Sequence, residues 1–215
     1  MAAKSFVVFG LGQFGSSVAA ALGKNGCEVL AVDIKEERVQ DIASAVTYAV
    51  KGDVTDPDIY ESLGLNNMDG AIIAITNSME ASVMATILSK EAGIPYVMAK
   101  ASSDTHAIVL RKLGADRVIF PEKEMGYRVA RNMVFGKFVD TFELSDRFSM
   151  VELAVPSSWV GKSIRSLDIR RNWGVNIIAI KQGEDVDVSV DPDDILRPDQ
   201  VLLLVGDNAK LKKIR

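Results

Sequence analysis

Six residues near the start of the chain have the spacing of a dinucleotide-binding motif. Residues 10–15 read Gly-Leu-Gly-Gln-Phe-Gly; an apolar run over 5–9 precedes them and a helical pattern over 16–22 follows. Between a strand and a helix, the first glycine makes a tight turn, the second lets the backbone approach a pyrophosphate, and the third packs helix on strand. The phosphates are expected on the free N–H groups at the helix N-terminus. The predicted cofactor-binding residues here are Gly10, Leu11, Gly12, Gln13, Phe14 and Gly15.

An acidic residue follows at the distance that such a site requires. Asp33 ends the second apolar run, residues 28–32, about 20 residues after the glycines, where a carboxylate accepts hydrogen bonds from ribose hydroxyls. A 2′-phosphate would be repelled there, so an unphosphorylated adenosine ribose is expected rather than NADP. Asp33 could also cap the next predicted helix, and the two roles are compatible. Its neighbours Ile34, Lys35 and Arg38 are expected in the same site.

Two later loops are expected to complete the site. Asp53 stands at the carboxyl end of the strand predicted over 45–50, the edge at which open α/β sheets bind ligands. Ordinary turn chemistry explains Asp53 equally well. The apolar run over 69–75 reads as a strand buried on both faces. From these two loops the predicted binding residues are Asp53, Val54, Thr55, Ala74, Ile75 and Thr76.

The elements that position these residues alternate between strand and helix over about the first 135 residues. Strands are predicted at 5–9, 28–32, 45–50, 69–75, 96–99 and 117–120. This pattern predicts an α/β fold, a Rossmann-like doubly wound parallel sheet of order 3-2-1-4-5-6.

The remainder of the chain has a different pattern. Strands are predicted over 148–155, 175–180 and 201–205, with a helix over 163–170. These elements predict a small α+β C-terminal domain. We expect a nucleotide-binding domain over 1–140 and this second domain over 141–215.

Composition narrows the possible classes of protein. The chain has 215 residues, of which 48% are hydrophobic, and no apolar stretch approaches the ~20 residues that span a bilayer. We therefore expect a cytoplasmic protein. The single cysteine excludes an intrachain disulfide framework, and the net charge of −4 gives no reason to expect nucleic acid as a partner.

A catalytic constellation is not apparent in the sequence. His106, the one histidine, lies within a predicted helix and reads as a surface or half-buried residue. Tyr96 and Lys100 have the Tyr-x-x-x-Lys spacing of a reductase, but on a strand they would lie about 13 Å apart. We therefore expect a nucleotide that acts as a signal, and no enzyme. A small NAD-dependent oxidoreductase completed by a partner chain remains the alternative; a nucleotide-sensing repressor would need a basic helix-turn-helix, which is not found.

The whole chain resembles a known family. The stretches that carry the resemblance are residues 10–15, 31–33, 52–55 and 113–122, the last reading Leu-Gly-Ala-Asp-Arg-Val-Ile-Phe-Pro-Glu. They are similar to the regulatory, ligand-gating subunits of bacterial Trk/Ktr potassium uptake systems, the RCK or KTN domain proteins of the KtrA/TrkA family.

The resemblance implies a function and a set of partners. It implies a homo-oligomer, an octameric ring of dimers, at the inner face of the membrane on a membrane-embedded potassium-translocating subunit of the Trk/Ktr type. ATP, ADP or NAD(H) would gate that partner. Asp33 would hold the ribose, residues 53–55 the adenine side and Lys100 the phosphates, while Glu122 would help to hold a divalent cation, Mg²⁺ or Ca²⁺. Without the resemblance, Glu122 reads as an acid in the first turn of a helix.

Two positions depart from the family pattern. Family members often carry Arg at the position of Gln13, and glutamine cannot neutralise a terminal phosphate, so the weight moves from ATP toward NAD(H). The C-terminal domain resembles one that binds cyclic di-AMP in some relatives. Residues 181–184 lack a histidine found in those binders, which counts against this ligand. The residues that would hold it are Ile164, Ile169, Arg170 and Asn176.

Overall fold

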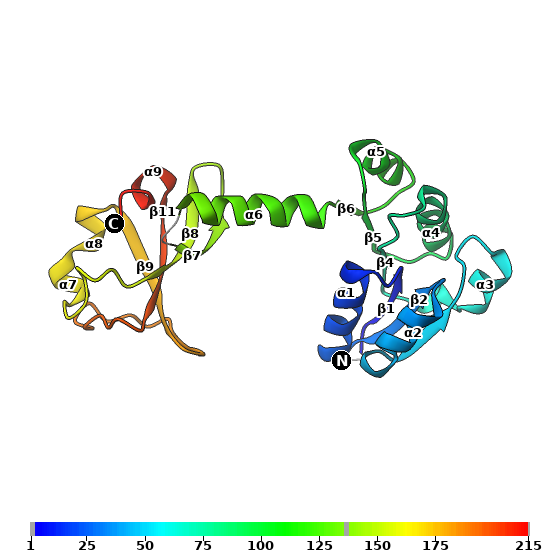
Figure 1. Ribbon diagram of the computed structural model, residues 1–215, viewed down its shortest axis with the longest axis horizontal. Coiled ribbons are helices and arrows are strands. Elements are labelled where there is room, and N and C mark those ends of the chain that lie inside the picture. Colours follow the sequence, from blue (N-terminus) through cyan, green and yellow to red (C-terminus); the bar gives the residue numbers. More distant parts are fainter. Residues whose placement is uncertain (1–2, 136–137, 215) are drawn as a thin grey trace. The chain divides into compact units, whose positions relative to one another are not determined.

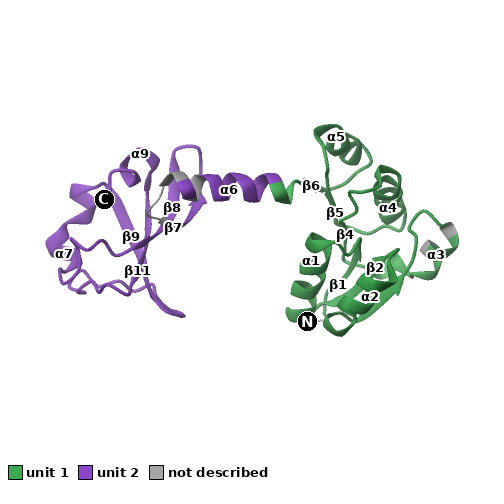
Figure 2. Ribbon diagram, in the orientation of Figure 1, with its two compact units in different colours: residues 1–122 green, residues 123–215 purple. Residues whose placement is uncertain are grey.

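The chain divides into two compact units, residues 1–122 and 123–215 (Figure 2). The computed structural model describes residues 3–135 and 138–214. The division falls within helix α6 (Pro121–Phe135), after its second residue. The domain limits expected from the sequence, 1–140 and 141–215, follow the change in the pattern of helices and strands. They stay a prediction.

The first unit contains a six-stranded parallel sheet of the predicted order, β3-β2-β1-β4-β5-β6 (Figure 1). Its strands are β1 (Ser5–Phe9), β2 (Glu28–Asp33), β3 (Tyr48–Lys51), β4 (Gly70–Ile73), β5 (Val97–Lys100) and β6 (Arg117–Ile119). All neighbouring strands pair in parallel. β4 is buried at every residue, as its continuous apolar sequence predicts for a strand covered on both faces.

Helices cover both faces of this sheet, and β1 shows how. Val8 packs with Ala19 of α1 and Val39 of α2, whereas Val7 and Phe9 belong to the cluster that includes residues of α4 and α5. Successive residues of a strand point to opposite faces, so an apolar run is needed to serve both layers. The helices are α1 (Gln13–Lys24), α2 (Glu36–Ile42), α3 (Pro57–Ser62), α4 (Met79–Glu91) and α5 (Asp104–Lys112), with 3₁₀ turns at Ala43–Ala45 and Leu65–Asn67.

The sheet order creates a crevice at one edge. From β1 the chain builds the sheet outward through β2 and β3, then crosses back so that β4 pairs with the other side of β1. The loops that leave the carboxyl ends of β1 and β4 therefore diverge, which is where open α/β sheets bind their ligands.

The second unit is built on a five-stranded antiparallel sheet of order β10-β9-β11-β8-β7. Its strands are β7 (Phe138–Glu143), β8 (Phe148–Ala154), β9 (Val175–Gln182), β10 (Asp185–Asp187) and β11 (Val201–Asp207). It has a separate core that includes Trp159 and Trp173, whose ring centroids are 4.9 Å apart. The α+β character predicted for this part of the chain is confirmed.

Two expectations about helices need correction. The helix predicted over 163–170 is two single turns, α7 (Ile164–Leu167) and α8 (Ile169–Asn172), because Asp168 between them adopts a left-handed conformation with φ of 43°. His106 is not a surface residue; its side chain is fully buried, on the face of α5 that packs inward with Ala107 and Leu110. The remaining helix is α9 (Asn208–Leu211). Across residues 3–135 and 138–214, none of the helices combines the length and apolar character needed to cross a membrane.

Candidate functional site

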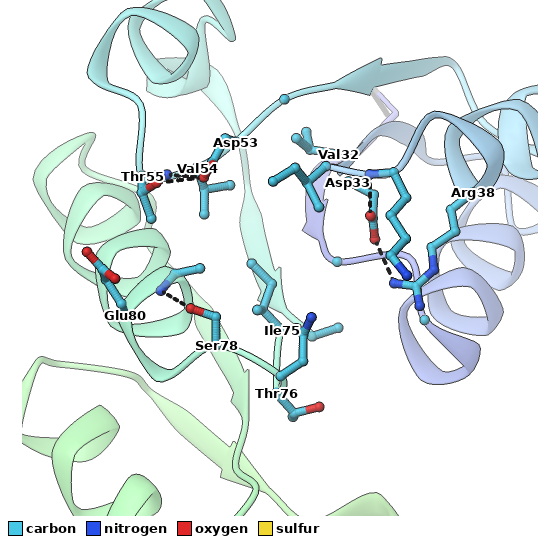
Figure 3. A pocket seen from close by; sticks show the side chains of 18 residues that line it. Val32, Asp33, Arg38, Asp53, Val54, Thr55, Ile75, Thr76, Ser78 and Glu80 are labelled. Atoms are coloured by element: carbon cyan, nitrogen blue, oxygen red, sulfur yellow. Dashed lines mark hydrogen bonds and ion pairs between the residues drawn. The ribbon is translucent and has the colours of Figure 1, made fainter.

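A cleft of about 400 Å³ opens at the carboxyl ends of β1, β2, β3 and β4 (Figure 3). Twelve of the predicted binding residues line it. From the first two strand ends these are Gly10, Gly12, Asp33, Ile34, Lys35 and Arg38. From the next two they are Asp53, Val54, Thr55, Ala74, Ile75 and Thr76. The structure thus brings together residues from four loops that are up to 66 positions apart in the sequence (Gly10 to Thr76).

Asp33 is the most constrained polar group in the cleft. Its side chain is buried, its Oδ2 accepts a 2.6 Å hydrogen bond from the Leu11 N–H, and its Oδ1 accepts a 2.8 Å bond from the Lys35 N–H. Arg38 Nη1 lies 3.2 Å from Oδ2. A carboxylate offers about four acceptor sites, so three donors leave capacity for a hydroxyl. The alternative role as a helix cap is wrong, because the N-cap of α2 is Lys35, which gives that helix no side-chain cap; the bond from the Lys35 N–H instead forms a turn after β2.

The three glycines of the motif differ in the space around them. Gly10 has φ of +89°, which favours glycine. A Cβ on Gly15 would lie 1.9 Å from the carbonyl oxygen of Gly10, so only glycine permits this approach of α1 to β1. A Cβ on Gly12 would meet no atom within 4 Å. Gly12 is also the N-cap of α1 and provides no side-chain hydrogen bond to the first turn, so the N–H groups there are not capped by it.

Asp53 forms a compact turn at the far wall of the cleft. Its Oδ1 accepts bonds from the Thr55 N–H at 2.9 Å and the Thr55 hydroxyl at 2.7 Å. These bonds, the hydroxyl first, hold the pKa of Asp53 below its usual value. Turn chemistry therefore accounts for this residue, and a contact with adenine stays a prediction.

Lys100 and Glu122 lie outside the residues that line the cleft, and they pair with each other. Lys100 Nζ forms an ion pair with Glu122 Oε1 and lies 5.7 Å from the centroid of the Phe14 ring. The Lys100 side chain is only 12% exposed. Its hydrogen bond lowers the pKa of the Glu122 carboxyl. Four residues of the glycine motif, Leu11, Gln13, Phe14 and Gly15, are likewise not part of the cleft wall.

The predicted cation site receives no support from this arrangement. Within the described residues, no three His, Cys, Asp or Glu side chains are grouped so that they could hold a metal ion. Glu122 offers a single carboxylate, and the ammonium of Lys100 already pairs with it. These residues alone do not fit a divalent cation.

Six residues of the cleft wall were not predicted. They are Val32, Gly52, Asn77, Ser78, Glu80 and Ala81. The position of Ser78 could have been predicted from the sequence, because serine before a helical pattern is a preferred N-cap. In the structure its Oγ accepts a 3.1 Å bond from the Ala81 N–H at the start of α4. The start of α4 therefore lies at the cleft.

A second hollow, of about 340 Å³, lies in the second unit. All four residues named for cyclic di-AMP line it: Ile164, Ile169, Arg170 and Asn176. They come from α7, α8 and β9, so the packing of the two short helices on the sheet brings them together.

Comparison with known proteins gives matches over nearly all of the chain. Residues 6–121 match the TrkA-N domain and residues 148–215 the TrkA-C domain. The Ktr system potassium uptake proteins C and A of Bacillus subtilis (strain 168) are each 40% identical to this chain. The first match covers 94% of this chain and 92% of the relative, the second 98% and 95%. Ktr system potassium uptake protein A of Vibrio alginolyticus is 36% identical, over 97% of this chain and 94% of the relative.

Solved structures share the fold. The RCK domain of GsuK superposes with a TM-score of 0.64 at 17% identity, covering 98% of this chain and 46% of that one. The GsuK channel bound to NAD gives 0.63 at 17% identity, covering 98% and 38%. The present chain thus spans less than half of these structures.

The family relationship follows from the two domain matches and the three full-length relatives together. Those relatives are named as potassium uptake proteins, so the expectation that this chain is not an enzyme is confirmed. With a TrkA-N domain followed by a TrkA-C domain, the chain belongs to the TrkA family and, within it, to the Ktr system potassium uptake proteins.

Proposed function

We propose that this protein is the regulatory subunit that gates a potassium uptake channel or transporter in response to a nucleotide, ATP/ADP or NAD(H). Membership of the Ktr potassium uptake proteins supports the transport role. The single observation that carries nucleotide binding is the cleft in which Asp33 is held beside the uncapped first turn of α1.

The chemistry of the cleft fits an adenosine linked to phosphates. The start of α1 offers N–H groups and the positive end of a helix dipole to the phosphates. Asp33 keeps acceptor capacity for a ribose hydroxyl, and the apolar side chains of Val54 and Ile75 suit the flat face of a base. The GsuK channel bound to NAD and GsuK bound to ADP have the same fold, so this fold accommodates such ligands.

Gln13 bears on the choice of nucleotide. It follows the N-cap of α1 but brings no charge to a terminal phosphate. A positive side chain at this position would neutralise the terminal phosphate of ATP. NAD(H) and ADP carry only two phosphates in a row, so they are favoured over ATP. The divalent cation and cyclic di-AMP are further ligands to be tested, the second in the hollow lined by Arg170 and Asn176.

The proposed partners are further copies of this chain and a membrane-embedded potassium-translocating subunit of the Trk/Ktr type. Within α6, Met125, Val129 and Met133 are exposed and follow one another at intervals of four residues. This spacing forms an apolar stripe along one face of a helix, and such a stripe is covered when copies associate. An octameric ring of dimers on the cytoplasmic side of the membrane would provide that cover.

The test is potassium uptake into vesicles that hold the membrane subunit, with this protein present and the nucleotide varied. Calorimetry with ATP, ADP, NAD⁺ and NADH first establishes which of them bind. Uptake is expected to depend on both protein and nucleotide, without consumption of the nucleotide. Uptake indifferent to both, together with NADH oxidation by a small substrate, would show that the oxidoreductase alternative is correct.

A further inference from the structure

Helices α4 and α5 of the first unit meet along a surface that carries buried polar groups. Ser82, Thr86 and Ser89 of α4 are fully buried, and their spacing of four and three residues places them in one stripe along the helix. α4 contacts α5, where His106 is fully buried as well. Ala107 packs in the cluster against the sheet, and His106 lies about 100° away around the helix. Because α5 lies beside the edge strand β6, we infer that this buried flank faces α4.

The two helices begin at the same edge of the sheet. β4 and β5 pair in parallel, with Ile73 opposite Ala99 at their carboxyl ends, and α4 and α5 follow those ends in the sequence. Ser82 and His106 each lie in the first turn of their helix. The two side chains are therefore at the same level on adjoining helices.

Ser82 Oγ and His106 Nε2 are both buried, and among the residues that the structure describes neither atom has a hydrogen-bond partner. The Ser102 N–H donates to Nδ1 of His106 at 3.3 Å, so the proton of the neutral imidazole is on Nε2. Burial lowers the pKa of His106, which keeps the ring neutral. A donor and a hydroxyl thus lie in one helix contact, and a buried polar group is costly to leave without a partner.

We propose that one water molecule is bound between Nε2 of His106 and Oγ of Ser82, and that this bridge positions the first turn of α4. A buried water makes about three hydrogen bonds. It can accept from the Nε2–H group, bond to Ser82 Oγ and donate to Thr86 Oγ1, whose own proton goes to the Ser82 carbonyl at 2.8 Å. The small side chains on this stripe of α4 leave room for it.

The bridge acts on a wall of the cleft. Ser78, Glu80 and Ala81, at the start of α4, line the cleft (Figure 3), and Ser82 is the next residue, buried inside the unit. α5 thereby holds this wall in place without touching the ligand. This part of the inference rests on the proposed function, because the wall is that of the proposed nucleotide site.

Urea denaturation distinguishes a bridged hydroxyl from one without a partner by the sign of the change. If the water is bound, Ser82→Ala takes away one of its partners and the midpoint falls. If Oγ has no partner, alanine removes a buried polar group at no loss, and the midpoint stays or rises, which would overturn the bridge. The matched control is Ser89→Ala, on the same stripe, whose Oγ donates to the Ala85 carbonyl of its own helix at 2.6 Å.

Two variants of His106 separate the bridge from simple packing. His106→Asn keeps an acceptor near Nδ1 but has no group at the place of Nε2, so the midpoint is expected to fall. His106→Gln has an amide that reaches the place of Nε2 and is expected to restore most of that loss. The losses of Ser82→Ala and His106→Asn should not add in the double variant, whereas those of Ser89→Ala and His106→Asn should. Additive losses in both pairs would overturn the bridge.

A high-resolution crystal structure of the unchanged protein tests the water itself. A density peak about 2.7–3.2 Å from both Nε2 of His106 and Oγ of Ser82 is expected. A direct bond between the two atoms, or two atoms too far apart for one water to join, would overturn the site.

Calorimetry with ADP tests the positioning role. Ser82→Ala and His106→Asn are expected to bind ADP at least about threefold more weakly than the unchanged protein, and Ser89→Ala and His106→Gln with the same affinity. Equal affinity in all four folded variants would overturn the positioning role. Failure of the unchanged protein to bind ADP would overturn the proposed function and the positioning role with it, while denaturation and crystallography would still decide the bridge.

Discussion

The backbone N–H of Leu11 donates a 2.6 Å hydrogen bond to Oδ2 of Asp33, which ties the glycine loop to the end of β2. Leu11 lies between the first two glycines of the motif, and both residues are buried. The acid proposed to bind the ribose is therefore also a structural support of the loop proposed to bind the phosphates. A substitution at Asp33 must affect the stability of the fold as well as the binding of a nucleotide.

Asp33→Ala is expected to lower the free energy of unfolding by about 1–3 kcal/mol, the cost of leaving a buried N–H without its partner. Urea denaturation measures this change. Asp41→Ala is the matched control, because Asp41 is exposed on the neighbouring helix α2, and is expected to change stability by less than about 0.5 kcal/mol. An Asp33→Ala variant as stable as this control would contradict the structural role.

The two glycines at the start of α1 are expected to respond differently to alanine. Gly12 has φ of −70° and open space around its Cβ position, so Gly12→Ala should cost no more than about 1 kcal/mol of stability, the effect of a poorer N-cap. The methyl group would enter the space proposed for the phosphates, so nucleotide affinity should fall at least about tenfold. Calorimetry on the folded variant measures that loss.

Gly15→Ala is expected to destabilise the fold itself by about 3 kcal/mol, because the methyl would collide with backbone. A variant with native stability would show that α1 can shift away from β1.

NADP(H) is expected to bind at least about tenfold more weakly than NAD(H), because its 2′-phosphate would lie against the Asp33 carboxylate. Arg38 offsets part of this repulsion, since its guanidinium lies 3.2 Å from Oδ2. Arg38→Met should therefore increase the preference for NAD(H). Calorimetry with both cofactors on both proteins checks this, and equal affinity of the unchanged protein for the two would refute it.

His106 is expected to make stability depend on pH below about 6.5, the usual pKa of an exposed histidine. Its side chain is fully buried, its Nδ1 accepts a 3.3 Å bond from the Ser102 N–H, and burial lowers its pKa from the usual 6.5. As pH falls below 6.5, the unfolded chain takes up a proton that the folded protein does not, so the free energy of unfolding decreases. It stops decreasing once pH passes the pKa of the folded state.

Urea denaturation between pH 5 and 8 measures this effect, with a limiting slope of about 1.4 kcal/mol per pH unit for one group. Because the chain has one histidine, His106→Gln should flatten the profile in this range. A profile that stays as steep in this variant would assign the effect to another group.

The features that could be predicted from the sequence are those that local pattern determines. The order of the parallel sheet follows from alternating strands and helices and from the handedness of their connections. The positions of Gly10 and Asp33 follow from the strand ends at which they lie, and that of Gly15 from the first turn of the helix that follows β1. Boundaries were less accurate: the strand expected over 45–50 is Tyr48–Lys51, because Ala43–Ala45 forms a 3₁₀ turn that extends α2.

The features that could not be predicted depend on tertiary packing. Lys100 and Glu122 are 22 residues apart in the sequence. They meet because β5, which ends at Lys100, pairs in parallel with β6, and α6 begins directly after β6. The resemblance predicted a separate role for each residue, phosphate binding for Lys100 and cation binding for Glu122, and it did not indicate that the two side chains pair. The break at Asp168 was also hidden, because no glycine or proline marks it and a non-glycine residue there adopts a positive φ.

The two tryptophans of the chain, Trp159 and Trp173, both belong to the core of the second unit. Indole fluorescence therefore reports on residues 123–215 and is blind to the first unit. A change in emission caused by nucleotide, and abolished by Gly12→Ala, would originate at the cleft and be detected in the other unit. The protein thus carries its own optical probe of communication between its two halves, and no label is required.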